Sequence, residues 1–136
     1  MNYDLVKQDL IRHEGLRLTP YLCSSDKITV GVGRNLDDRG ITENEAMYLL
    51  DNDIKLCQEE LEASILYWSS LSDEVQNITL NLCFNMGISR LLKFKKMWSA
   101  LNEGNMNEAA DQLLDSRYAS QVKGRATELA DRLRRA

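Results

Sequence analysis

The chain has 136 residues, of which 43% are hydrophobic and 28% are charged, and its formal net charge is −4. This length allows one compact core, or two small lobes that share a helix, and the composition excludes a loop-rich or disordered chain. No apolar run approaches the about 20 residues that cross a bilayer, and the charged N-terminal segment does not fit a signal peptide. We therefore expect a protein without stable membrane insertion that stays in the cytosol until something releases it.

A first helix is predicted from the first few residues to Glu14. Val6, Leu10 and Glu14 recur at intervals of four residues, so they share one face of this helix. Gly15 is a natural helix stop. Because apolar neighbours raise the pKa of a carboxyl group, Glu14 is a candidate proton donor near neutral pH.

Residues 16–34 are predicted to form a small β region. Within it, β-branched residues alternate with a threonine and two glycines: Ile28, Val30 and Val32 against Thr29, Gly31 and Gly33. We expect the β-branched face to pack inward and the other face to form the floor of a cleft, with Glu14 at its edge. A surface Glu14 and glycines at an ordinary bend are the alternative.

The rest of the chain is predicted to be helical after a polar connection at residues 35–40. Thr42 and Glu45 form a capping box that opens a long helix, which ends between residues 61 and 68. Ser72 caps a mostly apolar helix that Gly87 closes. Shorter helices follow, and the last covers residues 122–135. The predicted fold class is therefore α+β, mainly α.

The three cysteines, Cys23, Cys57 and Cys83, are widely spaced and are predicted to be free thiols. Cys57 and Cys83 lie in apolar helical patterns, so we expect both to be buried packing residues. With one histidine, the chain lacks the usual zinc ligands, and no metal site is predicted.

Glu14, Cys23 and Thr29 are separated by eight and five residues, and this pattern resembles the catalytic motif of the phage-type lysozymes, glycoside hydrolase family 24. That family has Glu, then Asp or Cys, then Thr at this spacing. The similarity continues in order through Asn81, Phe84–Gly87, Glu108–Ala110, Ser116–Tyr118 and Arg125. It implies a single lysozyme domain with a small β lobe at residues 15–41, a connecting helix at 42–62, and a helical lobe of residues 63–136 plus 1–14.

The resemblance implies that Glu14 is the general acid and that Cys23 and Thr29 position an attacking water, with no metal or cofactor. Many relatives carry aspartate at the position of Cys23, and a thiol does the same task less well unless its pKa is lowered. Alternatively, Cys23 is a packing residue, and Thr29 is present because threonine has a high strand propensity. Asp26 is a rival carboxylate outside the family spacing and is interpreted as a turn residue.

Further residues match family positions that support catalysis or bind sugar. Arg125 resembles an arginine that reaches the catalytic glutamate, where it would lower the pKa that burial raises. The predicted substrate-binding residues are Asn35, Phe84, Met97 and Gln112. Arg34 could also bind substrate or could be a solvated surface residue, and relatives carry a longer segment at residues 35–40.

The resemblance implies a monomeric endolysin, a muramidase that cuts the β-1,4 bond between N-acetylmuramic acid and N-acetylglucosamine in bacterial peptidoglycan. A separate holin-like protein would release it from the host cytoplasm. One alternative is a catalytically weakened peptidoglycan-binding module of the same fold. Another is a helical interaction protein whose basic end, residues 117–136, docks on an acidic partner. No nucleic acid is expected as a partner, because no recognised motif accompanies the basic residues.

Overall fold

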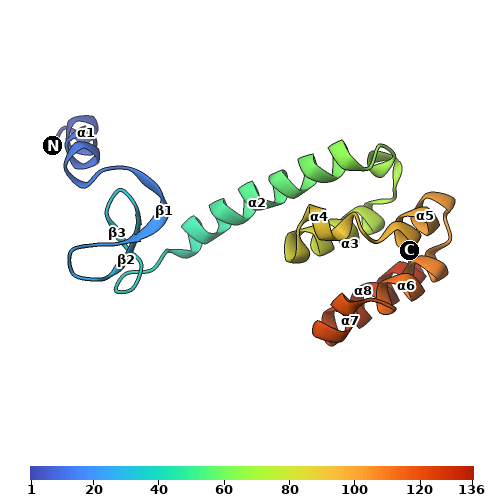
Figure 1. Cartoon of the computed structure of the whole chain (residues 1–136). Helices are drawn as coiled ribbons and strands as arrows, with labels where there is room; N and C mark the ends of the chain where they lie inside the picture. The colour runs from blue at the N-terminus through green and yellow to red at the C-terminus, as the bar shows by residue number, and fades with distance from the viewer. The chain divides into compact units, whose positions relative to one another are not determined.

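The computed structural model describes all residues, Met1–Ala136, and contains eight α-helices, one 3₁₀ helix and a three-stranded sheet (Figure 1). The predicted α+β, mainly α class is confirmed. In chain order the elements are α1 (Tyr3–Glu14), β1 (Arg17–Leu22), β2 (Ile28–Gly31), β3 (Arg34–Asn35), α2 (Glu43–Ser64), η1 (Trp68–Ser70), α3 (Asp73–Met86), α4 (Ile88–Leu91), α5 (Lys95–Glu103), α6 (Met106–Leu114), α7 (Arg117–Gln121) and α8 (Lys123–Arg135).

The chain divides into two compact units, Met1–Leu49 and Leu50–Ala136. The first unit holds α1, the sheet and the start of α2, and the second holds the rest of α2 and the remaining helices. The sequence-based grouping of residues 1–14 with the helical lobe differs from this division and stays a prediction. No helix combines the length and the apolar character that crossing a membrane requires.

The sheet of the first unit is antiparallel in the order β1-β2-β3. Thr29 is its central residue, because it pairs with Tyr21 on β1 and with Asn35 on β3. The two glycines assigned to the open face of a strand instead flank the tight connection between β2 and β3. Gly31 and Gly33 have φ of +70° and +63°, in the left-handed region that favours glycine.

The predicted orientation of the β2 face is wrong. Thr29 is 3% exposed, whereas Ile28 and Val32 are 43% and 38% exposed. Successive side chains of the strand do alternate between two faces, but the polar side chain lies on the inner one. Thr29 can be buried because its hydroxyl donates a 2.9 Å hydrogen bond to the Lys27 carbonyl. A buried hydroxyl with such a partner is tolerated, and its orientation is then set by the hairpin.

Arg34 joins β3 to the start of α2 inside the first unit. Its guanidinium donates to both carboxylate oxygens of Glu45, at 2.9 and 2.7 Å, and to the Gly40 carbonyl at 3.1 Å. Glu45 also completes the predicted capping box with Thr42, through bonds of 2.9 and 3.1 Å. Hydrogen bonding from Arg34, with help from Thr42, lowers the pKa of Glu45 to about 2. Arg34 therefore acts as a structural clasp, because both of its terminal guanidinium nitrogens donate to groups of the protein.

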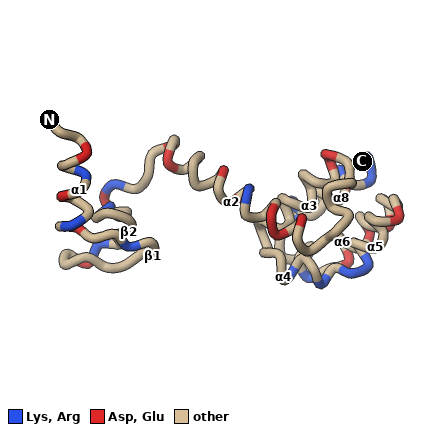
Figure 2. Tube along the Cα trace, turned by 90° about the horizontal axis from the view of Figure 1, so that it is seen from above, with Lys and Arg blue, Asp and Glu red and all other residues tan.

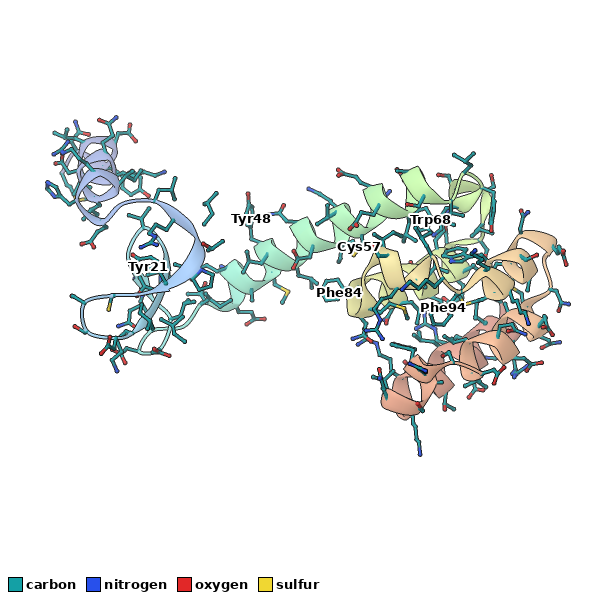
Figure 3. The ribbon with its side chains drawn as sticks, viewed as in Figure 1. Tyr21, Tyr48, Cys57, Trp68, Phe84 and Phe94 are labelled. Atoms are coloured by element: carbon teal, nitrogen blue, oxygen red, sulfur yellow. The ribbon has the colours of Figure 1, made fainter.

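The hydrophobic core lies in the second unit, where all the buried apolar side chains are found. α3 is buried along much of its length, and α6 packs against α5 and α8 (Figure 3). Ser72 and Gly87 bound α3, as the sequence predicts. Cys57 and Cys83 are buried free thiols, which confirms that prediction. This core makes the second unit a framework for residues on its surface.

Basic residues at the C-terminal end and acidic residues, coloured blue and red in Figure 2, both occur in the second unit. Arg132 pairs with Glu74 at 2.6 Å, and Arg134 pairs with Asp111 at 2.6 Å. Hydrogen bonding from Arg132 lowers the pKa of Glu74. These internal pairs account for part of the basic end, and they weaken the alternative in which it serves to dock an acidic partner.

Candidate active site

Glu14 is the last residue of α1, and its position is fixed by two glycines. Gly15 ends the helix with φ of +80° while its N–H donates to the Ile11 carbonyl at 2.9 Å. Gly33 leaves space for the side chain of Glu14, since a Cβ built on Gly33 would lie 2.9 Å from Glu14 Oε2. The carboxylate therefore lies against the turn between β2 and β3.

The predicted apolar surroundings of Glu14 are not found in the first unit. α1 buries none of its residues, and Val6 and Leu10 are 38% and 48% exposed. Glu14 itself is exposed and contacts the backbone of a glycine turn. The sequence places the carboxylate on the correct helix end, but its neighbours come from a turn that helical periodicity does not reveal.

Cys23 opens the loop that joins β1 to β2. Its N–H donates to the Lys27 carbonyl at 3.0 Å, and its carbonyl accepts from the Asp26 N–H at 2.9 Å. Asp26 is exposed and has φ of +59°, a conformation that aspartate tolerates in turns. The interpretation of Asp26 as a turn residue is confirmed.

The loop surrounds the Cys23 thiol with hydrogen-bond donors. The backbone N–H of Lys27 lowers the pKa of Cys23 most, and the N–H of Ser25 lowers it further. Partial burial raises the pKa of Cys23, but by less than either of these two N–H groups lowers it. Backbone N–H groups close to a side chain stabilise its anionic form. The same N–H groups would stabilise an aspartate carboxylate at this position as well as a thiolate.

Thr29 lies next to Cys23 at the start of β2. Since its hydroxyl proton is used in the bond to the Lys27 carbonyl, the oxygen keeps lone pairs that can accept a hydrogen bond from water. Cys23, Thr29 and Glu14 are thus all arranged around β2 and its two flanking turns. Cys23 and Thr29 lie close together at one end of β2, and Glu14 lies against the turn that follows the other end.

Asn35, the predicted substrate residue of the first unit, is bonded within its own turn. Its Nδ2 donates to Asp38 Oδ2 at 3.0 Å, and its Oδ1 accepts from the Asp38 N–H at 3.0 Å. This side chain shapes the connection to α2. Its predicted contact with substrate stays a prediction.

Phe84 and Arg125 line one hollow of about 360 Å³ in the second unit, and Phe84 is labelled in Figure 3. Phe84 is 44% exposed, so its ring is available to a ligand. Arg125 Nε donates to Asn81 Oδ1 at 2.9 Å, which orients the guanidinium and gives Asn81 its partner. The predicted ion pair between Arg125 and Glu14 stays a prediction.

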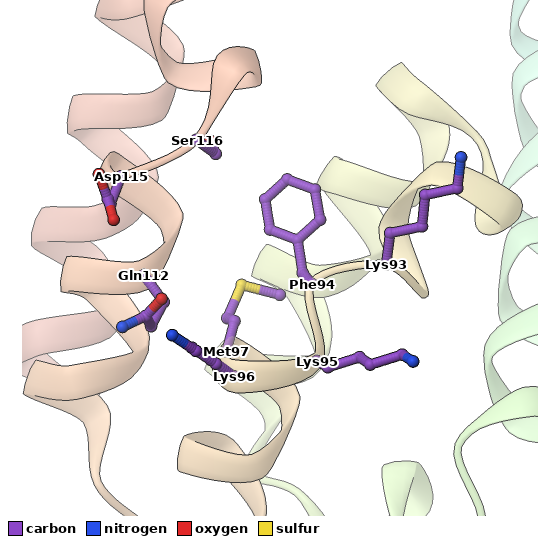
Figure 4. A pocket seen from close by; sticks show the side chains of 8 residues that line it. All are labelled: Lys93, Phe94, Lys95, Lys96, Met97, Gln112, Asp115 and Ser116. Atoms are coloured by element: carbon purple, nitrogen blue, oxygen red, sulfur yellow. The ribbon is translucent and has the colours of Figure 1, made fainter.

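Met97 and Gln112 line another hollow of the second unit, about 370 Å³ in volume (Figure 4). Met97 is 1% exposed, and Gln112 Nε2 donates to Glu108 Oε1 at 2.8 Å. The complete lining is Lys93, Phe94, Lys95, Lys96, Met97, Gln112, Asp115 and Ser116. Sequence reasoning missed the three lysines, although they are close together in the chain and could have indicated a basic rim.

Comparison with known proteins places the chain in a family. The phage lysozyme family matches residues 11–136. The chain is also 25% identical over 146 aligned positions to the pre-baseplate central spike protein Gp5 of Enterobacteria phage T4. That alignment covers 87% of this chain but 25% of the spike protein, so the chain spans about a quarter of the length of this relative. Because the family match covers nearly all of the chain, this protein belongs to the phage lysozyme family.

Proposed function

We propose that this protein is a muramidase that hydrolyses the β-1,4 bond between N-acetylmuramic acid and N-acetylglucosamine in bacterial peptidoglycan. The observation that carries the proposal is the placement of Cys23 and Thr29 at one end of β2 and of Glu14 against the turn that follows its other end. Membership of the phage lysozyme family supports a lysozyme-like activity on peptidoglycan.

In the proposed reaction, protonated Glu14 donates its proton to the glycosidic oxygen as the bond to the anomeric carbon breaks. A water molecule attacks that carbon from the opposite face of the sugar and inverts its configuration. The Cys23 thiolate accepts a hydrogen bond from this water and takes its proton as the new C–O bond forms, while the Thr29 oxygen accepts a second hydrogen bond. Proton exchange with solvent then restores the thiolate and protonated Glu14. The lowered pKa of Cys23 supports this role, because a neutral thiol attracts the water proton less strongly.

We further propose that the second unit contributes to sugar binding. The exposed ring of Phe84 offers an apolar surface for a sugar face. In the other hollow, the basic rim formed by Lys93, Lys95 and Lys96 suits the carboxylates of peptidoglycan stem peptides. Met97 would form the apolar part of that hollow and Gln112 its polar edge.

The biological role proposed for this activity is that of a monomeric endolysin. It would remain in the host cytoplasm until a holin-like protein opens the membrane, and it would then degrade the cell wall. The spike-protein relative is much longer than the aligned region, so its name does not assign this chain a role in a spike.

The test is digestion of purified insoluble peptidoglycan, followed by borohydride reduction and mass spectrometry of the soluble fragments. The proposal predicts fragments that end in reduced N-acetylmuramic acid. Fragments that end in reduced N-acetylglucosamine would show a different bond specificity. Co-sedimentation with peptidoglycan without any soluble fragment would favour the alternative of a binding module.

A further inference from the structure

Three potential metal ligands converge in the second unit. The Sγ atoms of Cys57 and Cys83 and a carboxylate oxygen of Glu60 all lie within 4.8 Å of one another. Cys57 and Glu60 are on α2, and Cys83 is on α3; Figure 3 labels Cys57 between these helices. None of the three lines the two hollows described above.

We propose that Cys57, Cys83 and Glu60 bind a thiophilic divalent cation, for which Zn²⁺ is the reference metal. Zinc binds thiolate sulfur at about 2.3 Å and carboxylate oxygen at about 2.0–2.2 Å in tetrahedral sites. Two sulfurs on such an ion are about 3.8 Å apart, from the tetrahedral angle and these bond lengths. Ligand atoms within 4.8 Å of one another can reach this geometry by small side-chain movements.

The local structure places the ligands on two rigid supports. Cys57 and Glu60 are three residues apart, so they share one face of α2. Cys57 and Cys83 are 8% and 1% exposed within the hydrophobic core, and Glu60 is partly exposed at its edge. The carboxylate therefore marks a route for the ion from solvent, and a water molecule could occupy the fourth ligand position there.

The three groups are two thiols and one carboxylate, which a divalent cation binds as two thiolates and a carboxylate oxygen. A bound Zn²⁺ would offset the charges of two thiolates and one carboxylate while two protons leave, so binding strengthens as pH rises.

A disulfide is the simpler use of two neighbouring thiols, but it leaves Glu60 without a role. It also requires the sulfurs to approach to about 2.05 Å in a specific geometry. The convergence of a carboxylate on both sulfurs is what favours an ion.

The experiment is a Co²⁺ titration of the full chain, kept reduced with a phosphine, followed by displacement with Zn²⁺. Tetrahedral thiolate-bound Co²⁺ has characteristic visible and near-ultraviolet absorption. We expect saturation at one equivalent, release of two protons, loss of the absorption on addition of Zn²⁺, and a Zn²⁺-dependent increase in Tm.

The variants assign the signal to its ligands. Cys57→Ala and Cys83→Ala should lose the absorption, and Glu60→Gln, a change at the edge of the core, should weaken Co²⁺ binding at least about tenfold. Cys23→Ala, in the other unit, should bind as the wild type does. The proposal is overturned if the folded wild type gives no tetrahedral spectrum, if Glu60→Gln binds normally, or if only Cys23→Ala loses the signal.

Discussion

The Glu14 carboxylate lies against the backbone of Gly33. A Cβ on Gly33 would lie 2.9 Å from Glu14 Oε2 and 3.3 Å from both Cβ and Cδ of Glu14. The absence of a side chain at residue 33 thus sets where the proposed general acid lies relative to β2. This relationship makes Gly33 a positioning residue for Glu14.

Replacing Gly33 by alanine should displace Glu14 and lower peptidoglycan hydrolysis by at least about tenfold, equivalent to about 1.4 kcal/mol of transition-state stabilisation. It should also reduce stability by about 1–2 kcal/mol, because Gly33 has a φ of +63°. Gly31→Ala is the matched control, since its φ is +70° but a Cβ there meets nothing within 4 Å. The measurement compares the hydrolysis rates and the urea unfolding curves of the two variants. An equal loss of activity in both would mean that the contact between residue 33 and Glu14 has no special role.

Removal of the Thr29 hydroxyl should affect both stability and activity. Thr29→Val keeps the shape of the side chain but removes one of the two hydrogen bonds to the Lys27 carbonyl, which still accepts from the Cys23 N–H, so the loss should cost about 0.5–1.5 kcal/mol. Thr29→Ser keeps the hydroxyl and should retain more activity than the valine variant. Unfolding curves and initial rates measured below the midpoint of unfolding separate the two effects. A fully active, folded Thr29→Val protein would limit Thr29 to a structural role.

Cys23→Asp should be active and Cys23→Ala nearly inactive, because the loop N–H groups that lower the thiol pKa also stabilise a carboxylate. The ratio of Cys23→Asp to wild-type activity should be largest at acidic pH. There the wild-type thiol is protonated, whereas an aspartate is still ionised. Rates from about pH 5 to pH 8, a range over which the thiol and carboxyl references differ in charge, provide the measurement. An alanine variant as active as the wild type would remove Cys23 from the mechanism.

Acid should weaken the clasp between Arg34 and Glu45. The folded-state pKa of Glu45 is about 2, below its ordinary value of 4.5, so its contribution to stability is full above 4.5 and is lost as pH falls through 2. Glu45→Gln should remove this part of the acid dependence. Amide signals of β2 and β3, followed by NMR during acid titration, report on the first unit. Glu74→Gln is the control in the second unit, and an unchanged profile for Glu45→Gln would contradict the assignment.

The sequence predicts helix boundaries well where local chemistry determines them. Ser72 accepts a hydrogen bond from the Val75 N–H, Thr42 and Glu45 form their capping box, and Gly87 ends α3, all as the motifs indicate. These interactions span three or four residues, so their signals are contained in short stretches of sequence. The buried state of Cys57 follows from apolar periodicity for the same reason.

Contacts between residues that are far apart in the sequence are harder to predict from the sequence alone. The inner face of β2 was misassigned because Thr29 is buried by a hydrogen bond within its hairpin, which hydrophobic alternation does not encode. The contact of Glu14 with Gly33 and the pairing of Arg125 with Asn81 join different elements. Family spacing identified the catalytic candidates but gave no information about these supporting partners.

The most direct test of the central claim is the rate at which folded Glu14→Gln protein releases soluble fragments from purified peptidoglycan. Glutamine keeps the size of the side chain but cannot donate the proton that the leaving oxygen requires. We predict a rate at least about 100-fold below that of the wild type, in line with the loss of general acid catalysis. The variant should keep the circular dichroism spectrum and Tm of the wild type, because Glu14 is exposed. Fragment release at the wild-type rate by a folded Glu14→Gln protein would contradict the proposed mechanism.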